Sequence, residues 1–290
     1  MITFPSILFP VDFSEQCLAL VPAVKAMSRR FRSELTVLHS IDLPPVAFGP
    51  AEAAAWATLI NSDRIRAEGR ISLARFVQDN FPGERVGMEL REGDAAHSIA
   101  EYAEENHTGL IMMPTHGYGP FRALLLGSVA AKVLHDAHCP VWTGVHAEEA
   151  AAHPPDRWHR MVCALDAGPR DLELLRWAAC FAAEQKAELR LVHAVSGAGT
   201  SLTEETDPSM YEFLFNVARE RIAKLQSQAG TDFEVCILGT SVSHAVRQSA
   251  LGHRADLVLI GRGVIQQPFG RLRSDAYAII REAPCPVLSL

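Results

Sequence analysis

Several features that would place a protein in a special class are absent from this sequence. It has no run of about 18 apolar residues, so we expect no membrane span. Its opening residues, MITFPSILFPVDFSE, lack the basic segment and apolar stretch of a secretory signal. The six cysteines include no Cys-x-x-Cys pair and are typical of reduced thiols; they are Cys17, Cys139, Cys163, Cys180, Cys236 and Cys285. We therefore expect a cytoplasmic protein.

Basic residues are fewer than acidic ones. The 27 lysines and arginines face 34 aspartates and glutamates, which gives a net charge of −7. Because nucleic acids and anionic membranes are bound through basic surfaces, we expect neither as a partner. The sequence also has no G-x-x-x-x-G-K-[ST] motif, and the early segment PVDFSEQ contains no glycine. A Walker-type phosphate loop and the dinucleotide fingerprint are thereby excluded.

What the sequence does contain is a repeat. Its 290 residues, 48% hydrophobic and 21% charged, suffice for about two globular domains. SILFPVDFS at 6–14 matches MVCALDAGP at 161–169, and SELTVLHSI at 33–41 matches AELRLVHAV at 187–195. Asp12 and Asp166 are 154 residues apart, whereas Cys139 and Cys285, like Gly93 and Gly239, are 146 apart. We interpret this as a duplicated domain with an eight-residue deletion in the second copy, before Gly239.

Each copy alternates short apolar runs with amphipathic segments. In the first copy we expect strands near 6–11, 35–39, 85–90, 109–113 and 140–143, and helices near 15–32, 51–80, 95–105 and 128–135. The second copy repeats this order. The pattern predicts two tandem, doubly wound α/β domains with mainly parallel five-stranded sheets, a Rossmann-like architecture. We predict domains at 1–146 and 158–290, joined by a linker at 147–157 that contains Pro-Pro.

The residues that end the predicted strands are the candidate site, because open α/β sheets bind ligands beyond the carboxyl ends of their strands. In the first copy these are Asp12, His39–Ser40, Gly93 and the segment that begins at Met113. Gly127-Ser128 falls where a helix begins, and a helix amino end suits a phosphate group. The same pair is equally compatible with a simple helix start that Ser128 caps. We predict no metal site, since His135, His138 and Cys139 have no further ligand at a suitable spacing.

The segments LFPVDFS, LHSID, THG, LLLGSV and CPVW resemble the universal stress proteins, over nearly the whole chain and twice. ATP-binding members of that family carry G-x2-G-x9-G-[ST]. This sequence matches at Gly117, Gly127 and Ser128, but has Pro114 in place of the first glycine. Proline removes a backbone N–H, so a ligand contact that needs this N–H is lost.

The resemblance implies an adenine-nucleotide α-hydrolase-like fold and ATP, with or without Mg²⁺, as the ligand of the first copy. It implies that Asp12 and the region of Ser40 hold the adenine or ribose and that Met113 lines the adenine pocket. Pro114 begins the phosphate loop, and Gly117, Gly127, Ser128 and Val129 would wrap the phosphates. The role implied is binding and signalling in stress responses, with no catalytic residue assigned.

The second copy departs from this pattern. Arg273-Ser274 stand where Gly127-Ser128 stood, and an arginine in place of glycine would crowd a phosphate. We expect a mainly structural half, in which Arg262, Arg271 and Arg273 either bind phosphate or form a solvated or salt-bridged surface. Edge-to-edge pairing of the last strands of the two copies would give an intrachain pseudo-dimer, and a homodimer is also compatible. Two alternatives to nucleotide binding and signalling stay open, namely a scaffold without nucleotide and a slow ATP hydrolase or nucleotidyl transferase.

Overall fold

The computed structural model describes residues 2–42, 62–116, 126–145, 157–168, 170–195, 208–262 and 271–290. Strands and helices alternate along the chain, as the sequence predicts. The first half comprises β1 (Ser6–Pro10), α1 (Glu15–Phe31), β2 (Glu34–Ile41), α3 (Ser62–Asn80), β3 (Val86–Glu92), α4 (Ala95–Glu105), β4 (Leu110–Met113), α5 (Ser128–Asp136) and β5 (Val141–Thr143). The second comprises β6 (Arg160–Ala164), α6 (Asp171–Gln185), β7 (Glu188–Ala194), α7 (Pro208–Ala229), β8 (Glu234–Leu238), α8 (Val242–His253), β9 (Leu257–Ile260), α9 (Arg271–Glu282) and β10 (Val287–Ser289).

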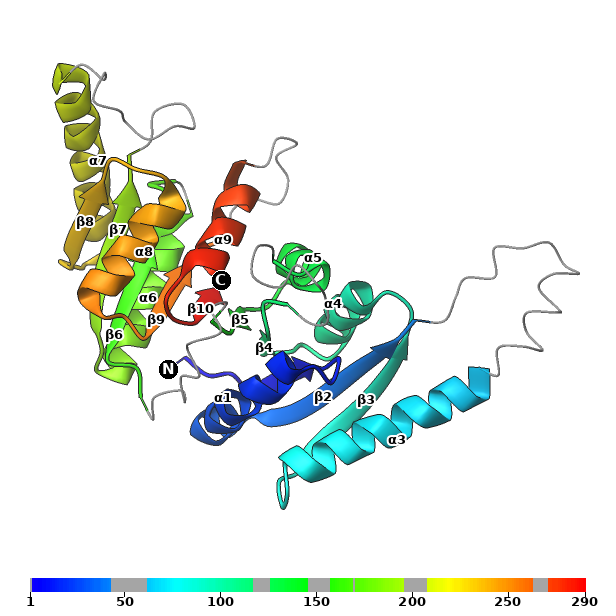
Figure 1. The fold of residues 1–290 in the computed structure, drawn as a ribbon. Helices are drawn as coiled ribbons and strands as arrows, with labels where there is room; N and C mark the ends of the chain where they lie inside the picture. The colour runs from blue at the N-terminus through cyan, green and yellow to red at the C-terminus, as the bar shows by residue number, and fades with distance from the viewer. Residues whose placement is uncertain are drawn as a thin grey trace, which may run out of the picture.

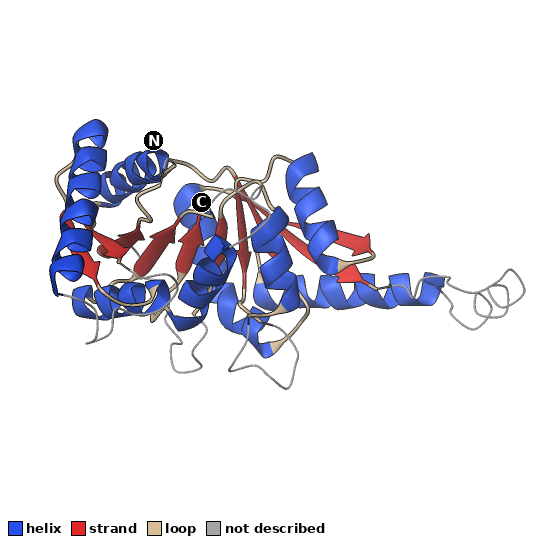
Figure 2. Ribbon diagram, turned by 90° about the horizontal axis from the view of Figure 1, so that it is seen from above, coloured by secondary structure: helices blue, strands red, loops and turns tan. Residues whose placement is uncertain are grey.

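The strands form one sheet that crosses both halves, with helices on both of its faces (Figures 1 and 2). Its order is β3-β2-β1-β4-β5-β10-β9-β6-β7-β8, and the strands within each half are parallel. The α/β, doubly wound prediction is therefore confirmed. The sheet itself differs from the prediction of two five-stranded sheets. The halves join edge to edge, so ten strands share one ladder of hydrogen bonds.

The two halves meet through β5 and β10, which pair antiparallel. Trp142 lies opposite Leu288, and these positions are 146 residues apart, so each is the other's counterpart in the repeat. The flanking pairs, Val141 with Ser289 and Thr143 with Val287, are each other's counterparts, because the offset of 146 relates Val141 to Val287 and Thr143 to Ser289. The register is thus self-complementary about one point, as in a two-fold interface. This confirms the predicted pairing of the closing strands within one chain.

The strand registers correct one detail of the repeat. Ile7 pairs with Leu110 in the first half, and its counterpart Met161 pairs with Leu257 in the second. Leu110 and Leu257 are 147 residues apart, so β3 and β4 follow an offset of 147 rather than 146. The deletion is therefore seven residues between β7 and β8, with one more between β9 and β10. Equivalent positions in the two halves are defined by the hydrogen-bond register of the strands. By that register Gly93 and Gly239 are not counterparts, because they are 146 residues apart and the offset here is 147.

Two apolar cores lie on opposite faces of the sheet. One packs α1, α3, α6 and α7 against it, and the other packs α4, α5, α8 and α9. On the first face, Phe4 and Trp158 occupy equivalent positions just before β1 and β6. Phe4 lies 6.5 Å from Phe181 and Trp158 lies 5.3 Å from it, between ring centroids, so aromatic packing joins the halves beneath the sheet. The predicted helix at 51–80 is confirmed over α3, and residues 51–61 lie outside the described part.

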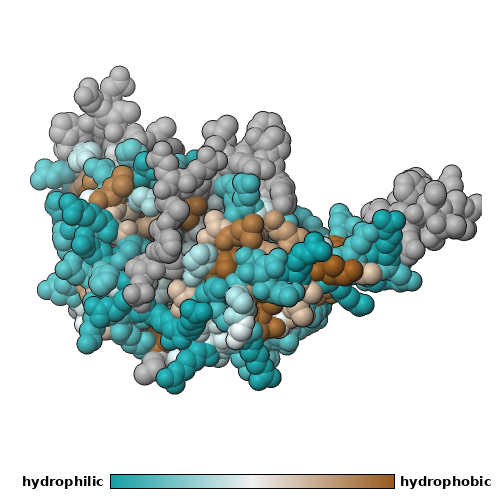
Figure 3. Space-filling view, turned by 60° about the horizontal axis from the view of Figure 1, so that its bottom comes forward, coloured by the Kyte–Doolittle hydropathy of each residue, from teal (hydrophilic) through white to brown (hydrophobic). Residues whose placement is uncertain are grey.

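The outer surface is mostly polar, with a few large apolar side chains. Figure 3 shows apolar side chains gathered in places on one face, among hydrophilic neighbours. Ile71, Met88 and Phe213 are more than half exposed. Within the described residues, no helix is both long and apolar enough to span a membrane. All six cysteines are unpaired thiols.

Candidate functional site

The candidate site lies at the carboxyl ends of the strands of the first half. There β1 has β2 on one side and β4 on the other, so the direction of winding changes between β1 and β4. Doubly wound sheets bind ligands at this switch point. Because the strands are parallel, β1, β2, β3 and β4 all end at this edge, which carries Asp12, Gly93 and Pro114 after the strands and Ser40 near the end of β2.

Asp12 organises the turn between β1 and α1. The side chain is exposed at the strand end, and its Oδ1 accepts hydrogen bonds from the Ser14 N–H (3.0 Å) and the Cys17 thiol (3.1 Å). Burial, followed by the negative charge of Asp12, raises the pKa of the Cys17 thiol to about 12. The thiol therefore stays protonated and keeps donating to Asp12, which fixes the carboxylate at the edge of the crevice.

His39 and Ser40 bind neighbouring strand ends. His39 Nδ1 lies 2.8 Å from the Val11 carbonyl oxygen, which can only accept, so Nδ1 carries the proton. The second half repeats this bond between His193 Nδ1 and Leu165 O, also at 2.8 Å. A recurring bond of this kind indicates a structural histidine rather than a catalytic one. Ser40 Oγ donates to the Gly93 carbonyl (2.9 Å), so it holds the turn after β3.

Position 127 requires glycine because the start of α5 comes close to the backbone at Thr115 and His116. Its N–H donates to the Thr115 carbonyl (2.9 Å), which brings the start of α5 against the end of β4. A β-carbon on Gly127 would lie 3.2 Å from both Thr115 O and the Cα of His116. Glycine has no side chain to cap the helix, so the first N–H groups of α5 point to the crevice edge without a side-chain cap from Gly127.

The other residues implied by the resemblance lie around this point. Ser128 and Val129 are exposed in the first turn of α5, and Pro114 is half-buried directly after β4. Met113 is only 4% exposed and packs in the core under α4 and α5, so it supports the crevice from below. Gly117 lies outside the described residues. The structure therefore brings the described candidates to one edge of the sheet.

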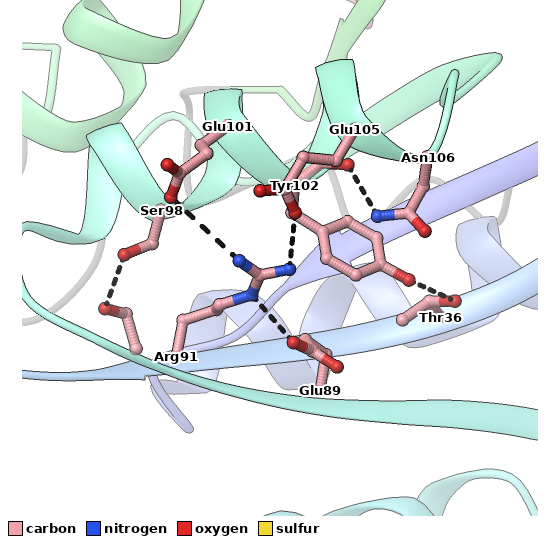
Figure 4. Close-up of polar contacts among 9 residues, drawn as sticks. Thr36, Glu89, Arg91, Ser98, Glu101, Tyr102, Glu105 and Asn106 are labelled. Atoms are coloured by element: carbon pink, nitrogen blue, oxygen red, sulfur yellow. Dashed lines mark hydrogen bonds and ion pairs between the residues drawn. The ribbon is translucent and has the colours of Figure 1, made fainter.

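Charged side chains hold α4 and α5 in place beside the crevice. Arg91 on β3 donates to Glu89 (2.7 Å) and Glu105 (2.8 Å) and lies 5.3 Å from the centre of the Tyr102 ring (Figure 4). Lys132 of α5 donates to Asp94 at the start of α4 (2.8 Å). This hydrogen bond holds the pKa of the Asp94 carboxyl below its usual value. These contacts fix the two helices relative to the strand ends.

The equivalent edge of the second half has different chemistry. Asp171 stands at the repeat position of Cys17, so the strand-end Asp166 faces a second carboxyl group instead of a thiol. Both carboxyl groups accept from the Gly168 N–H, at 2.7 Å from Asp166 and 3.2 Å from Asp171. Sequence reasoning missed Asp171, although the 154-residue offset from Cys17 points to it.

Tyr211 of α7 lies against the carboxyl-end edge of the sheet in the second half. A β-carbon on Gly239, which directly follows β8, would lie 2.7 Å from the Tyr211 hydroxyl oxygen. At Gly93, which directly follows β3, a β-carbon would meet nothing within 4 Å. Tyr211 therefore occupies space at the carboxyl-end edge of the second half. No sequence signal indicated the position of Tyr211.

Arg262 corrects another expectation. It was expected to bind phosphate or lie on a solvated surface, but its guanidinium donates to the carbonyls of Ala137 (2.5 Å) and Cys139 (2.7 Å) in the first half. The side chains of Arg271 and Arg273 lie outside the described residues. Within the described chain, no group of three or more His, Cys, Asp or Glu side chains is arranged to hold a metal ion.

Together, the fold and this edge define a tandem, doubly wound α/β protein whose first half brings the described candidate residues to the carboxyl ends of its strands. A family model of the universal stress protein family matches residues 3–143 and again 157–290. The chain therefore belongs to the universal stress protein family.

Individual relatives agree with this assignment. Universal stress protein MJ0531 of Methanocaldococcus jannaschii is 31% identical over 140 residues, which cover 48% of this chain and 80% of the relative. A crystal structure of a universal stress protein from Archaeoglobus fulgidus superimposes with a TM-score of 0.63 at 20% identity, covering 98% of this chain and 95% of the other. A protein of unknown function from Pseudomonas aeruginosa PAO1 gives 0.62 at 18% identity, with coverages of 99% and 92%. At these identities the two structures support the fold.

Proposed function

We propose that this protein binds an adenine nucleotide, ATP with or without Mg²⁺, in the first half only, and acts as a cytoplasmic binding and signalling protein in stress responses. The observation that carries the proposal is the start of α5. Gly127 holds the helix start against the end of β4 through its 2.9 Å bond to Thr115. The backbone N–H groups and positive dipole end of a helix placed there suit a nucleotide's phosphates.

The adenosine would lie along the neighbouring strand ends. The Asp12 carboxylate is exposed and held in position by Ser14 and Cys17, and a carboxylate can accept hydrogen bonds from ribose hydroxyls. Ser40 acts through the turn after β3, because its hydroxyl already donates to Gly93. Pro114 offers no N–H, so we assign the phosphate contacts to α5 and not to the turn after β4.

The second half supports single occupancy. A nucleotide placed there as in the first half would set its ribose beside the Asp166–Asp171 pair, whose carboxyl groups are already engaged with each other and with the Gly168 N–H, and Tyr211 occupies space beside Gly239. Both features oppose the ligand that the first half favours. We therefore expect one nucleotide per chain.

The test is calorimetric titration of the full chain with ATP, with and without MgCl₂. Wild type should bind with a stoichiometry near one. Ser128→Asp places a negative charge at the proposed phosphate position and should weaken binding at least about tenfold, or about 1.4 kcal/mol. Ser241→Asp is the matched control, because it makes the same change at the start of α8, away from the crevice. Absence of binding at millimolar ATP, or a Ser128→Asp variant with wild-type affinity, would contradict the proposal. Phosphate release measured in the same samples tests the hydrolase alternative.

A further inference from the structure

Helix α5 is held from the other half of the chain. Its middle accepts a hydrogen bond at Ala131 O from the Tyr277 hydroxyl of α9 (2.9 Å). Arg262 donates two more at and just beyond its carboxyl end, to Ala137 O at the C-cap and to Cys139 O in the segment before β5. Figure 1 shows α5 and α9 near each other where the halves meet. Thus one end of α5 faces the proposed ligand, and the other end is bound by the second half.

Arg262 is well placed for this role. It directly follows β9 and Gly261, and its own N–H donates to the Leu290 carbonyl (2.9 Å), which ties its backbone to the end of the chain. The side chain is half-buried, and burial lowers the pKa of its guanidinium, which nonetheless stays charged at neutral pH. A fixed positive charge at a helix carboxyl end stabilises the helix through its dipole and satisfies carbonyls that have no partner within the helix.

On the other side of the pseudo-two-fold axis, no arginine stands at the equivalent position. The residue that corresponds to Arg262 in the first half is Thr115, which is buried and lies 3.1 Å from His116 Nδ1. The end of α9 is instead bonded from within its own half, where Arg247 donates to the Glu282 carbonyl (3.0 Å). A symmetric interface would hold both helices alike. Here a cross-half arginine bonds the end of α5, whereas an arginine of the same half bonds the end of α9.

We infer that Arg262 is a positioning residue that fixes helix α5 from the second half and so makes nucleotide affinity in the first half depend on the second. The affinity part of this inference rests on the proposed function, whereas the positioning part does not. If the carboxyl end of α5 loses its anchor, the first turn can tilt away from Thr115. The N–H groups then lose the fixed direction on which tight phosphate binding depends.

The experiment compares Arg262→Gln with Arg247→Gln in the full chain. Both remove a charged side chain of the second half that bonds a helix end, but only Arg262 crosses to the first half. Hydrogen–deuterium exchange of the α5 peptide is measured first, without nucleotide. Arg262→Gln should accelerate exchange in α5 several-fold, and Arg247→Gln should leave it unchanged. Titration with ATP should then show about a threefold to thirtyfold loss of affinity for Arg262→Gln alone.

Arg262→Lys supplies the conservative variant and covers the case in which Arg262→Gln does not fold. Lysine keeps the charge but not the two-pronged geometry, so it should restore α5 protection and affinity in part. If α5 in the Arg262→Gln variant exchanges at the same rate as in the wild type, the positioning role is overturned. Faster exchange with unchanged ATP affinity would overturn the link to the ligand. If wild type binds no ATP, the proposed function fails, and the exchange data still decide whether Arg262 positions α5.

Discussion

Asp171 offers a sharp test of the chemistry in the second half. It is the first residue of α6, only 7% exposed, and shares the Gly168 N–H with Asp166. Burial, and then the charge of Asp166 and its hydrogen bond, raise the pKa of Asp171 to about 7. At neutral pH the pair therefore holds a proton between two carboxyl groups for part of the time.

The sign of the effect follows from comparing the folded and unfolded chains. An unfolded aspartate has a pKa of about 3.9, so between about pH 4 and pH 7 the folded state binds more protons. Stability then falls as the pH rises through this window, and the full penalty is present above pH 7. A pKa difference of about three units between the folded and unfolded states lowers the unfolding free energy by about 4 kcal/mol at most. Since water reaches part of the pair and screens it, we expect about 1 to 3 kcal/mol.

Asp171→Asn should remove this penalty. The amide oxygen can still accept from the Gly168 N–H, and the amide N–H can donate to Asp166, as the protonated acid does. The variant should gain about 1 to 3 kcal/mol in unfolding free energy at pH 8 and almost nothing at pH 4. Urea unfolding at both values measures this, with the exposed Asp232→Asn as control. Loss of stability at pH 8, or an equal gain at both pH values, would refute the reasoning.

Two further predictions concern backbone approach and the joint between the halves. Gly127→Ala should lower thermal stability by about 1 to 2 kcal/mol and weaken ATP binding, because the added carbon meets Thr115 O and the His116 backbone at 3.2 Å. Gly252→Ala, in a helix with nothing within 4 Å, should be neutral or stabilising by about 0.5 to 1 kcal/mol in the same melting assay. Trp142→Ala removes a side chain that is 3% exposed at the centre of the β5–β10 pair, and should cost about 3 to 5 kcal/mol in chemical unfolding. A loss within about 0.5 kcal/mol, as is usual for a surface substitution, would contradict a packed joint.

The order of elements and the pairing of the halves were predictable from the sequence, and the reason is physical. Buried parallel strands require nearly continuous apolar runs, so a duplicated domain shows them twice at a fixed spacing. The last strands at Val141 and Val287 are short apolar edges that need a partner. The offset read from Gly93 and Gly239 is wrong by one residue, because a glycine shared by two segments does not determine which residues pair in the sheet.

The contacts that make the halves unequal were not predictable in the same way. Asp171 can be located from the 154-residue offset, but its burial against Asp166 depends on the turn at Gly168. The Tyr211 hydroxyl reaches Gly239 from a different element, and Arg262 reaches Ala137 from the other half. Such contacts depend on side-chain direction between elements that are far apart in the sequence, which periodicity does not encode.

The geometry of the sheet separates the joint between the halves from the candidate ligand site. The joint lies at β5 and β10, where Trp142 and Leu288 pair across the axis and both must stay apolar. The crevice edges lie farther along the sheet, at β1 and β6, where a thiol at Cys17 can be replaced by the carboxyl of Asp171 without touching the joint. Helix α5 connects these two regions, because its first turn lies at the candidate site and its C-cap residue, Ala137, accepts a hydrogen bond from Arg262. In our proposal the second half therefore influences the first by holding the helix on which the proposed phosphate site depends.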